Sequence, residues 1–356
     1  MGDRERIGES ENRRAGGKEE QEKQMKKKKL RILIAYNDPA DAGANDLDYI
    51  SEVAVKNEAD IVYDTLIKMG HSPALMAVSG IEENIAEIND FSPDMLFNLC
   101  EGFHGQSKHE MHIAALWEIL GIPYSGNKPI TLGISQNKVL AKNIFTANGI
   151  PTPEFEVFDK VPEKTHLPFP LIVKPSNEDA SLGISQNSLA TDMESLRMIA
   201  TALLEKYKEP VLVEKFIEGR EFNVSIIGGK PAKALEISEI DFTALDGDTP
   251  KITGYESKWL EDHPLYRKTP SVCPAKTGTG LKKKLVSTAL KVYEVLMGKD
   301  YGRVDFRVDS KENVFVLEFN PNPDISADAG FSKSLRASGL SYEQFLKKII
   351  KDNTGY

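Results

Sequence analysis

Several features that would place this chain in a specialised class are missing from its sequence. Cysteine is scarce: Cys100 and Cys273 lie far apart and form no CxxC pair, so neither a disulfide framework nor a thiolate zinc site is supported. No apolar run approaches the about 20 residues that a membrane-spanning helix needs, and residues 1–29 hold no apolar core typical of a secretory signal. We therefore expect a cytoplasmic protein with no membrane partner.

An excess of positive charge is also missing. The formal net charge is −9, and no basic stripe with interleaved aromatic residues offsets it, so we expect no nucleic-acid partner. The basic cluster Lys26–Lys29 lies in a segment dense in both signs of charge and nearly free of apolar residues. This composition is typical of disorder, and it predicts a disordered charged tail over residues 1–29, with Met25 as an alternative start.

Familiar catalytic signatures are missing as well. No GxxxxGK[ST], HExxH or GxSxG motif occurs, and no GxGxxG fingerprint is present, which disfavours a P-loop NTPase, a zincin, an α/β-hydrolase and a dinucleotide-binding enzyme. His109 and His112 lie three residues apart in a predicted helix. Without further ligands, a surface pair is the better interpretation than a metal site.

The 356 residues, 40% hydrophobic and 28% charged, can bury a substantial core and predict two or three domains. From Leu30 onward, strand-like and helix-like segments alternate, which indicates an α/β fold. Buried strands are expected at 30–36 and 94–100, and helices at 51–69 and 109–120. These segments predict a Rossmann-like amino-terminal domain over residues 30–127.

The remainder predicts a mixed α+β region, which we divide into residues 128–215 and 216–356. Apolar runs at 211–216, 221–227 and 233–240 resemble one antiparallel sheet. Residues 241–263 are polar and long for a connection, which indicates a mobile lid. The other elements expected are helices at 136–148, 281–297 and 342–351, strands at 154–158 and 170–174, and a hairpin formed by 302–309 and 313–320.

The hairpin at 302–320 carries the strongest chemical signal. Residues two apart share a face of a strand, so Glu318 and Asn320 point the same way, and the adjacent strand can bring Asp305 and Arg303 beside them. Three oxygen ligands suit Mg²⁺ held against a nucleotide, with Arg303 placed to stabilise a developing oxyanion. A solvated charged hairpin is the alternative, but it does not explain acidic residues inside Val-Asp-Phe and Leu-Glu-Phe-Asn.

Two lysines are candidate phosphate ligands. Lys138 lies near the start of a predicted helix, and Lys174 ends an apolar strand. Either lysine alone is weak evidence. Residues 175–185 after Lys174 are rich in small side chains, and their backbone N–H groups could surround a triphosphate.

Together these segments resemble the D-alanine–D-alanine ligase family of the ATP-grasp superfamily, from about Leu30 to Ile350. The most specific matches are IVKPS, VEKFIEGREFNV, YESKW, CPA, GRVDF and LEFNPNP. The resemblance implies an ATP-grasp fold with an amino-terminal Rossmann-like (pre-ATP-grasp) domain, and an ADP-forming ligase that joins a carboxylate to an amine through an acyl phosphate. It also implies ATP and Mg²⁺, with two ions and Mn²⁺ as an alternative, small amino-acid or short-peptide substrates, and a homodimer.

The resemblance also implies roles for individual residues. Lys138, Lys174 and Lys258 would contact ATP phosphates, with Ser181 and Gly183 on a closing loop. Asp305, Glu318 and Asn320 would bind the metal, and the catalytic residues would be Arg303, Lys258, His104 and Glu52. The residues implied around adenine and ribose are Glu214, Lys215, Phe216, Ile217, Glu221 and Leu317.

The sequence departs from the family pattern where amino acids would bind. Ala180 and Trp259 stand where the family has Ser and Tyr, Asp324 replaces a Gly, and HGQSKHEM keeps only His104 and Gly105 of the motif HGxxGEDG. We therefore expect intact ATP handling with altered amino-acid recognition, and Asp324 favours a cationic or differently oriented amine. The alternatives are a true D-alanine–D-alanine ligase of peptidoglycan synthesis and a non-catalytic nucleotide-binding regulator.

Overall fold

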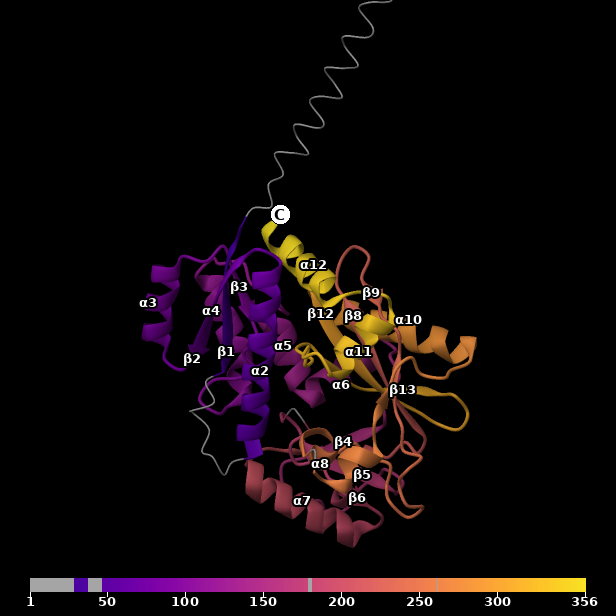
Figure 1. The fold of residues 1–356 in the computed structure, drawn as a ribbon. Coiled ribbons are helices and arrows are strands. Elements are labelled where there is room, and N and C mark those ends of the chain that lie inside the picture. Colours follow the sequence, from indigo (N-terminus) through magenta and orange to yellow (C-terminus); the bar gives the residue numbers. More distant parts are fainter. Residues whose placement is uncertain (1–28, 38–46, 179–180, 261) are drawn as a thin grey trace, which may run out of the picture.

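The computed structural model describes residues 29–37, 47–178, 181–260 and 262–356, with backbone alone over 47–53 (Figure 1). The amino-terminal half contains β1 (Arg31–Asn37), α2 (Leu47–Lys68), β2 (Ser72–Val78), α3 (Ile81–Phe91), β3 (Met95–Asn98), α4 (Glu110–Ile119), α5 (Pro129–Gln136), α6 (Lys138–Ala147), β4 (Phe155–Phe158), β5 (Leu171–Pro175), β6 (Leu189–Ala190) and α7 (Met193–Tyr207). The remaining elements are β7 (Val211–Lys215), β8 (Arg220–Ile227), β9 (Lys233–Ala234), β10 (Ser238–Ile240), α8 (Tyr255–Trp259), α9 (Pro264–Lys268), β11 (Ser271–Val272), α10 (Thr279–Val295), β12 (Tyr301–Val308), β13 (Val314–Asn320), α11 (Gly330–Ala337) and α12 (Tyr342–Thr354).

The first sheet is parallel, in the order β2-β1-β3, as the alternating pattern predicted. Ile32 and Ile34 of β1 pack toward α2 and α12, whereas Leu33 and Ala35 pack toward α3 and α4. Because both faces of β1 are covered, nearly every residue in it is apolar. Strand β2 and helix α3 were not predicted from the sequence.

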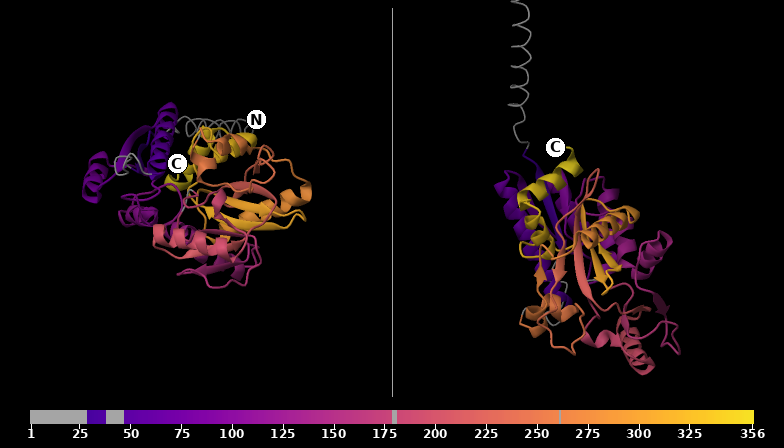
Figure 2. Two further views of the ribbon diagram at one scale, coloured as in Figure 1. Left: turned by 90° about the horizontal axis from the view of Figure 1, so that it is seen from below. Right: turned by 90° about the vertical axis from the view of Figure 1, so that its right-hand side faces the viewer.

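Two antiparallel sheets form the rest of the molecule, in the order β4-β7-β5-β6 and β11-β10-β8-β12-β13, with β9 beside β8. The smaller sheet packs on α7, and the larger on α10 and α6. The first sheet lies beside the larger one, and the smaller sheet forms the other end of the molecule (Figures 1 and 2). The domain limits expected from the sequence stay predictions.

The structure corrects one expectation about these sheets. The run at 211–216 does not join 221–227 and 233–240 in one sheet, because β7 pairs with β4 and β5 while β8 pairs with β10 and β12. The helix expected at 136–148 is present as α6, which begins after Asn137, whose side chain accepts a hydrogen bond from Leu140 N. Helix α5, which ends just before Asn137, was not predicted. An apolar pattern carries no information about which strands pair, so the sequence could not separate the sheets.

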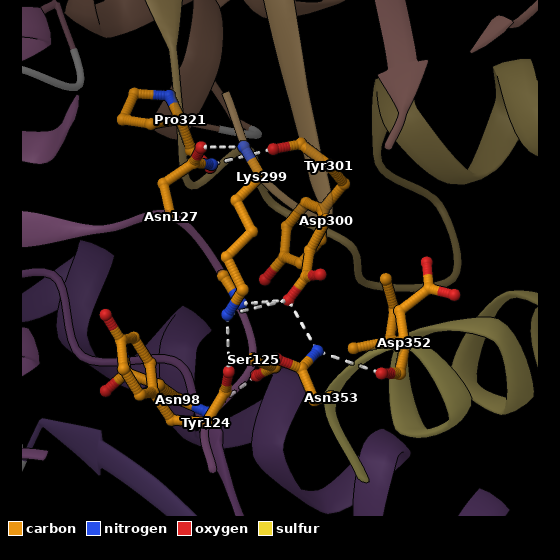
Figure 3. A network of polar contacts seen from close by, with 12 residues as sticks. Asn98, Tyr124, Ser125, Asn127, Lys299, Asp300, Tyr301, Pro321, Asp352 and Asn353 are labelled. Carbon is orange, nitrogen blue, oxygen red and sulfur yellow. Dashed lines mark hydrogen bonds and ion pairs between the residues drawn. The ribbon is translucent and has the colours of Figure 1, made fainter. Parts of the chain in front are cut away.

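A polar network joins the first sheet to the hairpin of β12 and β13 (Figure 3). Asn127 donates from Nδ2 to the carbonyl oxygens of Tyr301, at 2.8 Å, and Pro321, at 2.7 Å. Its Oδ1 accepts from the backbone N–H of Lys299 at 2.6 Å. One buried side chain thereby satisfies backbone groups on both sides of the hairpin and fixes the hairpin against the amino-terminal sheet.

Among the described residues, every helix falls short of the length and apolarity that crossing a bilayer demands. The charged tail expected at residues 1–29 lies outside the described residues, apart from Lys29.

Candidate active site

The hairpin brings its polar side chains together, as the strand period predicted. Asp305 on β12 pairs with Glu318 on β13, and Arg303 pairs with Asn320. Arg303 donates to Asp305 from Nε at 2.7 Å and from Nη2 at 2.8 Å, as a two-bond ion pair. On the other side of β12, Asn223 of β8 donates from Nδ2 to Asp305 Oδ1 at 2.7 Å. A row of polar groups therefore crosses three adjacent strands.

Three lysines surround Glu318. Burial opposes the charge of this carboxylate, but Lys138, Lys258 and Lys174, together with Arg303, outweigh burial and lower the pKa of Glu318 to about 2. Lys138 Nζ is 3.9 Å from Glu318 Oε2 and also donates to the carbonyl oxygen of Glu178. Such a concentration of cations around one carboxylate is expected where polyanionic phosphates bind.

A cleft of about 650 Å³ separates the two antiparallel sheets and ends at the polar row. Its apolar part includes Ile172 of β5, Phe216 after β7 and Leu317 of β13. The residues predicted from the sequence that line it are Lys174, Ser181, Glu214, Lys215, Phe216, Ile217, Glu221, Lys258, Asp305, Leu317 and Glu318. An apolar slot with charged groups at one end matches the two parts of a nucleotide, its base and its phosphates.

Glu214 at the floor of this cleft is almost fully buried between two lysines. Lys174 Nζ lies 2.7 Å from Glu214 Oε2, and Lys142 contacts Oε1. Burial favours the neutral acid, yet the two lysines prevail and hold the pKa of Glu214 below its usual value. Lys142 was not predicted as a site residue, although it follows Lys138 by one helical turn, which places both on one side of α6.

A second ion pair closes the far end of the cleft. Arg307 Nη1 lies 3.2 Å from Glu221 Oε2, and Arg307 also donates to the carbonyl oxygens of Ile217 and Lys251 at 2.9 Å each. Burial raises the pKa of Glu221, and Arg307 opposes that rise. Arg307 was missed in the sequence, although the strand period puts it on the same face as Arg303 and Asp305.

The loop after β5 contacts the segment that was expected to be a lid. Tyr255 N donates to the carbonyl oxygen of Ile184 at 2.9 Å, and Gln186 Nε2 donates to that of Ile252 at 3.0 Å. A Cβ atom on Gly254 would lie 2.7 Å from Ile184 O, so only glycine permits this approach. These contacts hold Lys258 of α8 at the cleft.

The chemistry of the hairpin fits a hard divalent cation. Asp305, Glu318 and Asn320 offer two carboxylates and an amide, the oxygen ligands that Mg²⁺ prefers, and phosphate oxygens with water would complete the shell. In the described part of the chain, no group of three or more His, Cys, Asp or Glu side chains is placed to hold a metal by itself. The residues therefore suit a cation that is shared with a phosphate ligand.

Some predicted site residues lie outside the cleft lining. Arg303 and Asn320 flank Asp305 and Glu318 in the hairpin, and Lys138 contacts Glu318. Gly183 has a φ of +73°, and a Cβ there would meet Pro175, so it shapes the loop. His104 lies after β3 and does not line the cleft. The structure does not describe the side chain of Glu52 or any part of Ala180.

Comparisons with known proteins agree with this architecture. The family described as "D-ala D-ala ligase C-terminus" matches residues 138–351. The D-alanine–D-alanine ligase of Bordetella avium is 31% identical over 254 residues, which are 70% of this chain and 75% of that protein. An uncharacterized protein of Sinorhizobium fredii, y4sG, is 30% identical over 301 residues, 82% of this chain and 86% of the relative.

The fold is likewise shared with solved structures. The D-alanine–D-alanine ligase of Bacillus anthracis, in a crystal structure described as complexed with ATP, has a TM-score of 0.71 and 22% sequence identity. The match covers 91% of this chain and 97% of that one. The chain therefore belongs to the D-alanine–D-alanine ligase family, has the ATP-grasp fold and is an ATP-dependent, ADP-forming ligase.

Proposed function

We propose that this ligase joins the carboxylate of one amino-acid-like substrate to the amine of another, through an acyl phosphate, at the end of the cleft between the two antiparallel sheets. The observation that carries the proposal is the meeting of Lys138, Lys174 and Lys258 around Glu318, directly beside Arg303. A binding protein for nucleotides needs the lysines, but it has no use for a partly buried arginine next to the phosphate end.

In this proposal, adenine occupies the apolar slot beside Phe216 and Leu317, and the backbone at Lys215 and Ile217 provides hydrogen bonds to it. Glu221 takes the ribose hydroxyls. Further support comes from the position of Glu214, whose charge is already balanced by Lys142, so that Lys174 can turn toward a phosphate without leaving a buried carboxylate unpaired.

Asp305, Glu318 and Asn320 would hold Mg²⁺, which neutralises charge on the phosphates when it is bound. The protein's own groups then act in two steps. The lysines orient the terminal phosphate toward the substrate carboxylate, whose oxygen bonds to phosphorus as ADP leaves. The neutral amine next bonds to the carbonyl carbon of the acyl phosphate, and Arg303 stabilises the oxyanion of the tetrahedral intermediate. The C–O bond to phosphate then breaks, and the nitrogen gives up one proton to the departing phosphate as the amide forms.

The segment 241–263 would act as a lid that protects the acyl phosphate from water. Its contacts with the loop after β5 support this role, because they bring Lys258 to the phosphate end. Glu52 and His104 are the proposed groups beside the amino-acid substrates. A homodimer and a cytoplasmic location are further predictions.

The proposal is tested by measuring ADP release with ATP and Mg²⁺ across all pairs of L- and D-amino acids, with products identified by mass. We expect one or a few pairs to release ADP and to yield a product lighter than its two substrates by one water. No ADP release with any pair would contradict the proposal and would favour a nucleotide-binding regulator. If D-alanine is both best donor and best acceptor, the enzyme is a true D-alanine–D-alanine ligase.

A further inference from the structure

A second, smaller cavity lies where the amino-terminal sheet meets the loop after β13. It measures about 180 Å³ and is lined by Glu58 of α2, Leu99 and Glu101 after β3, Tyr301 of β12, and Asn322 with Pro323 after β13. This volume includes space that is open to solvent. The enclosed part therefore has room for one small polar group at the end of a substrate, rather than for a complete small molecule.

Carboxyl groups gather at the cavity: Glu58 and Glu101 line it, and Asp324 follows Pro323 in the chain. Burial raises the pKa of Glu58 well above its usual value, and the nearby carboxylates of Asp324 and Glu101 raise it further. Glu58 is only 5% exposed. Its one hydrogen bond comes from the backbone N–H of Ile325, at 3.1 Å, and no lysine or arginine of the described residues pairs with it.

Two further buried polar atoms near the cavity lack hydrogen-bond partners among the described residues. Asn322 donates from Nδ2 to Glu110 at 2.7 Å, but its Oδ1 is buried without a donor among the described residues. The hydroxyl of Tyr342, outside the cavity lining, is also buried without a partner among the described residues. Burial raises the pKa of Tyr342, and the charges of Glu58 and Asp324 raise it further. Buried carboxylates and carbonyl oxygens that lack donors call for a ligand with several N–H groups.

The cavity adjoins the proposed catalytic hairpin. Asn322 and Pro323 lie just beyond Pro321, which follows Asn320, and Asn322 N donates to Asn320 Oδ1 at 3.1 Å. The charge of Asp324 acts on Arg303 and is one of the influences that raise the pKa of that guanidinium. Arg303 donates from Nε and Nη2 to Asp305, so these two groups do not form an ion pair with the carboxyl groups of the cavity.

We propose that this cavity binds a protonated alkylamine of one of the two joined substrates, so that the enzyme selects a basic amino acid or a diamine over a neutral substrate. The inference rests on the proposed ligase function. An ammonium group supplies three donors and a positive charge, which complement Glu58, Asp324 and the free oxygen of Asn322. The methyl side chain of D-alanine supplies no donor and no charge to these groups, which disfavours it.

A purely structural role for these carboxylates is the alternative. Glu58 accepts from Ile325 N, and Asp324 Oδ1 accepts from Ser326 N at 2.7 Å, so both could serve only to shape the loop. The substitutions Glu58→Gln and Asp324→Asn keep an acceptor for each N–H and remove the charge alone. Asp328→Asn is a matched control, because Asp328 lies exposed on the same loop.

The test measures kcat/KM for ADP release with lysine, ornithine or cadaverine as one substrate, and with norleucine as the neutral counterpart of lysine. Each is offered alone and with D-alanine, in both enantiomers where they exist. We expect lysine or ornithine to exceed norleucine by about tenfold or more. Asp324→Asn and Glu58→Gln should lower that ratio by about tenfold, whereas Asp328→Asn should leave it unchanged. Activity with cadaverine would identify a diamine substrate, and its absence a basic amino acid.

Calorimetry of lysine and norleucine binding, in the presence of a non-hydrolysable ATP analogue, tests the cavity separately from the ligase function. Equal ADP release and equal binding for both compounds would overturn the cavity's assignment while the ligase stands. If no pair releases ADP but lysine still binds better than norleucine, the cavity is supported and the ligation chemistry fails. An unchanged ratio in Asp324→Asn and Glu58→Gln would assign these carboxylates to loop structure.

Discussion

Replacing Lys142 by methionine should change how the stability of this enzyme depends on pH. Lys142 is fully buried; it contacts Glu214 and donates to Thr152 Oγ1 at 2.7 Å. Burial lowers the pKa of Lys142 from 10.5 to about 8, against the opposing attraction of Glu214. At about 1.36 kcal/mol per pKa unit, the charged form is disfavoured in the folded protein by about 3 kcal/mol relative to the unfolded chain.

The sign follows from proton binding. Between about pH 8 and pH 10.5, the unfolded chain keeps a proton on Lys142 that the folded protein has lost, so stability rises with pH in this window. Lys142→Met removes that contribution. The free energy of unfolding of the wild type, minus that of the variant, should therefore increase by about 3 kcal/mol across the window.

Urea denaturation of both proteins at several pH values measures this difference, and other titrating groups cancel in the subtraction. The same comparison for Lys160→Met, at an exposed position, measures the effect of removing a surface lysine. A difference for Lys142→Met that stays constant or falls between about pH 8 and 10.5 would refute the reasoning, because a buried lysine with a lowered pKa cannot produce it.

Three further predictions concern the proposed lid, the contact of Asn127 with the hairpin, and the proposed catalytic hairpin. Gly254→Ala should raise the KM for ATP and lower kcat in steady-state assays, because its Cβ would meet Ile184 O. Gly247→Ala in the same segment should behave as the wild type, because a Cβ there has nothing within 4 Å. Asn127→Ala should lower the free energy of unfolding by about 2–3 kcal/mol in urea titrations, because it leaves buried backbone groups without hydrogen-bond partners. A loss below about 0.5 kcal/mol would contradict this structural role of Asn127. Asp305→Asn should reduce kcat for ADP release by about 100-fold or more with an unchanged circular dichroism spectrum, and undiminished turnover would mean that the metal site lies elsewhere.

Strand periodicity made the hairpin predictable. Acidic residues inside apolar runs have few structural explanations, and a period of two fixes which of them share a face, so the sequence alone was enough to group Asp305, Glu318 and Arg303. Local signals also mark α7, whose Asp192 and Ser195 form a capping box, although this helix was not among those predicted.

Contacts between distant segments could not be predicted in this way. Glu58 meets Ile325 across 267 residues of sequence, and no local pattern marks a glutamate in α2 as the partner of a loop after β13. The same holds for Asn127 and Pro321, which are 194 residues apart. The substrate selectivity proposed above depends on such contacts, whereas the nucleotide end of the site was proposed from local patterns and from the family resemblance.

The central claim is that Asp305 and Glu318 hold the terminal phosphates of ATP through Mg²⁺ at the end of the cleft. Calorimetric titration of ATP, with and without Mg²⁺, into the wild type and Glu318→Gln tests it most directly. We predict that Mg²⁺ strengthens ATP binding by the wild type and that Glu318→Gln loses most of this gain. An equal Mg²⁺-dependent gain in the two proteins would contradict the claim.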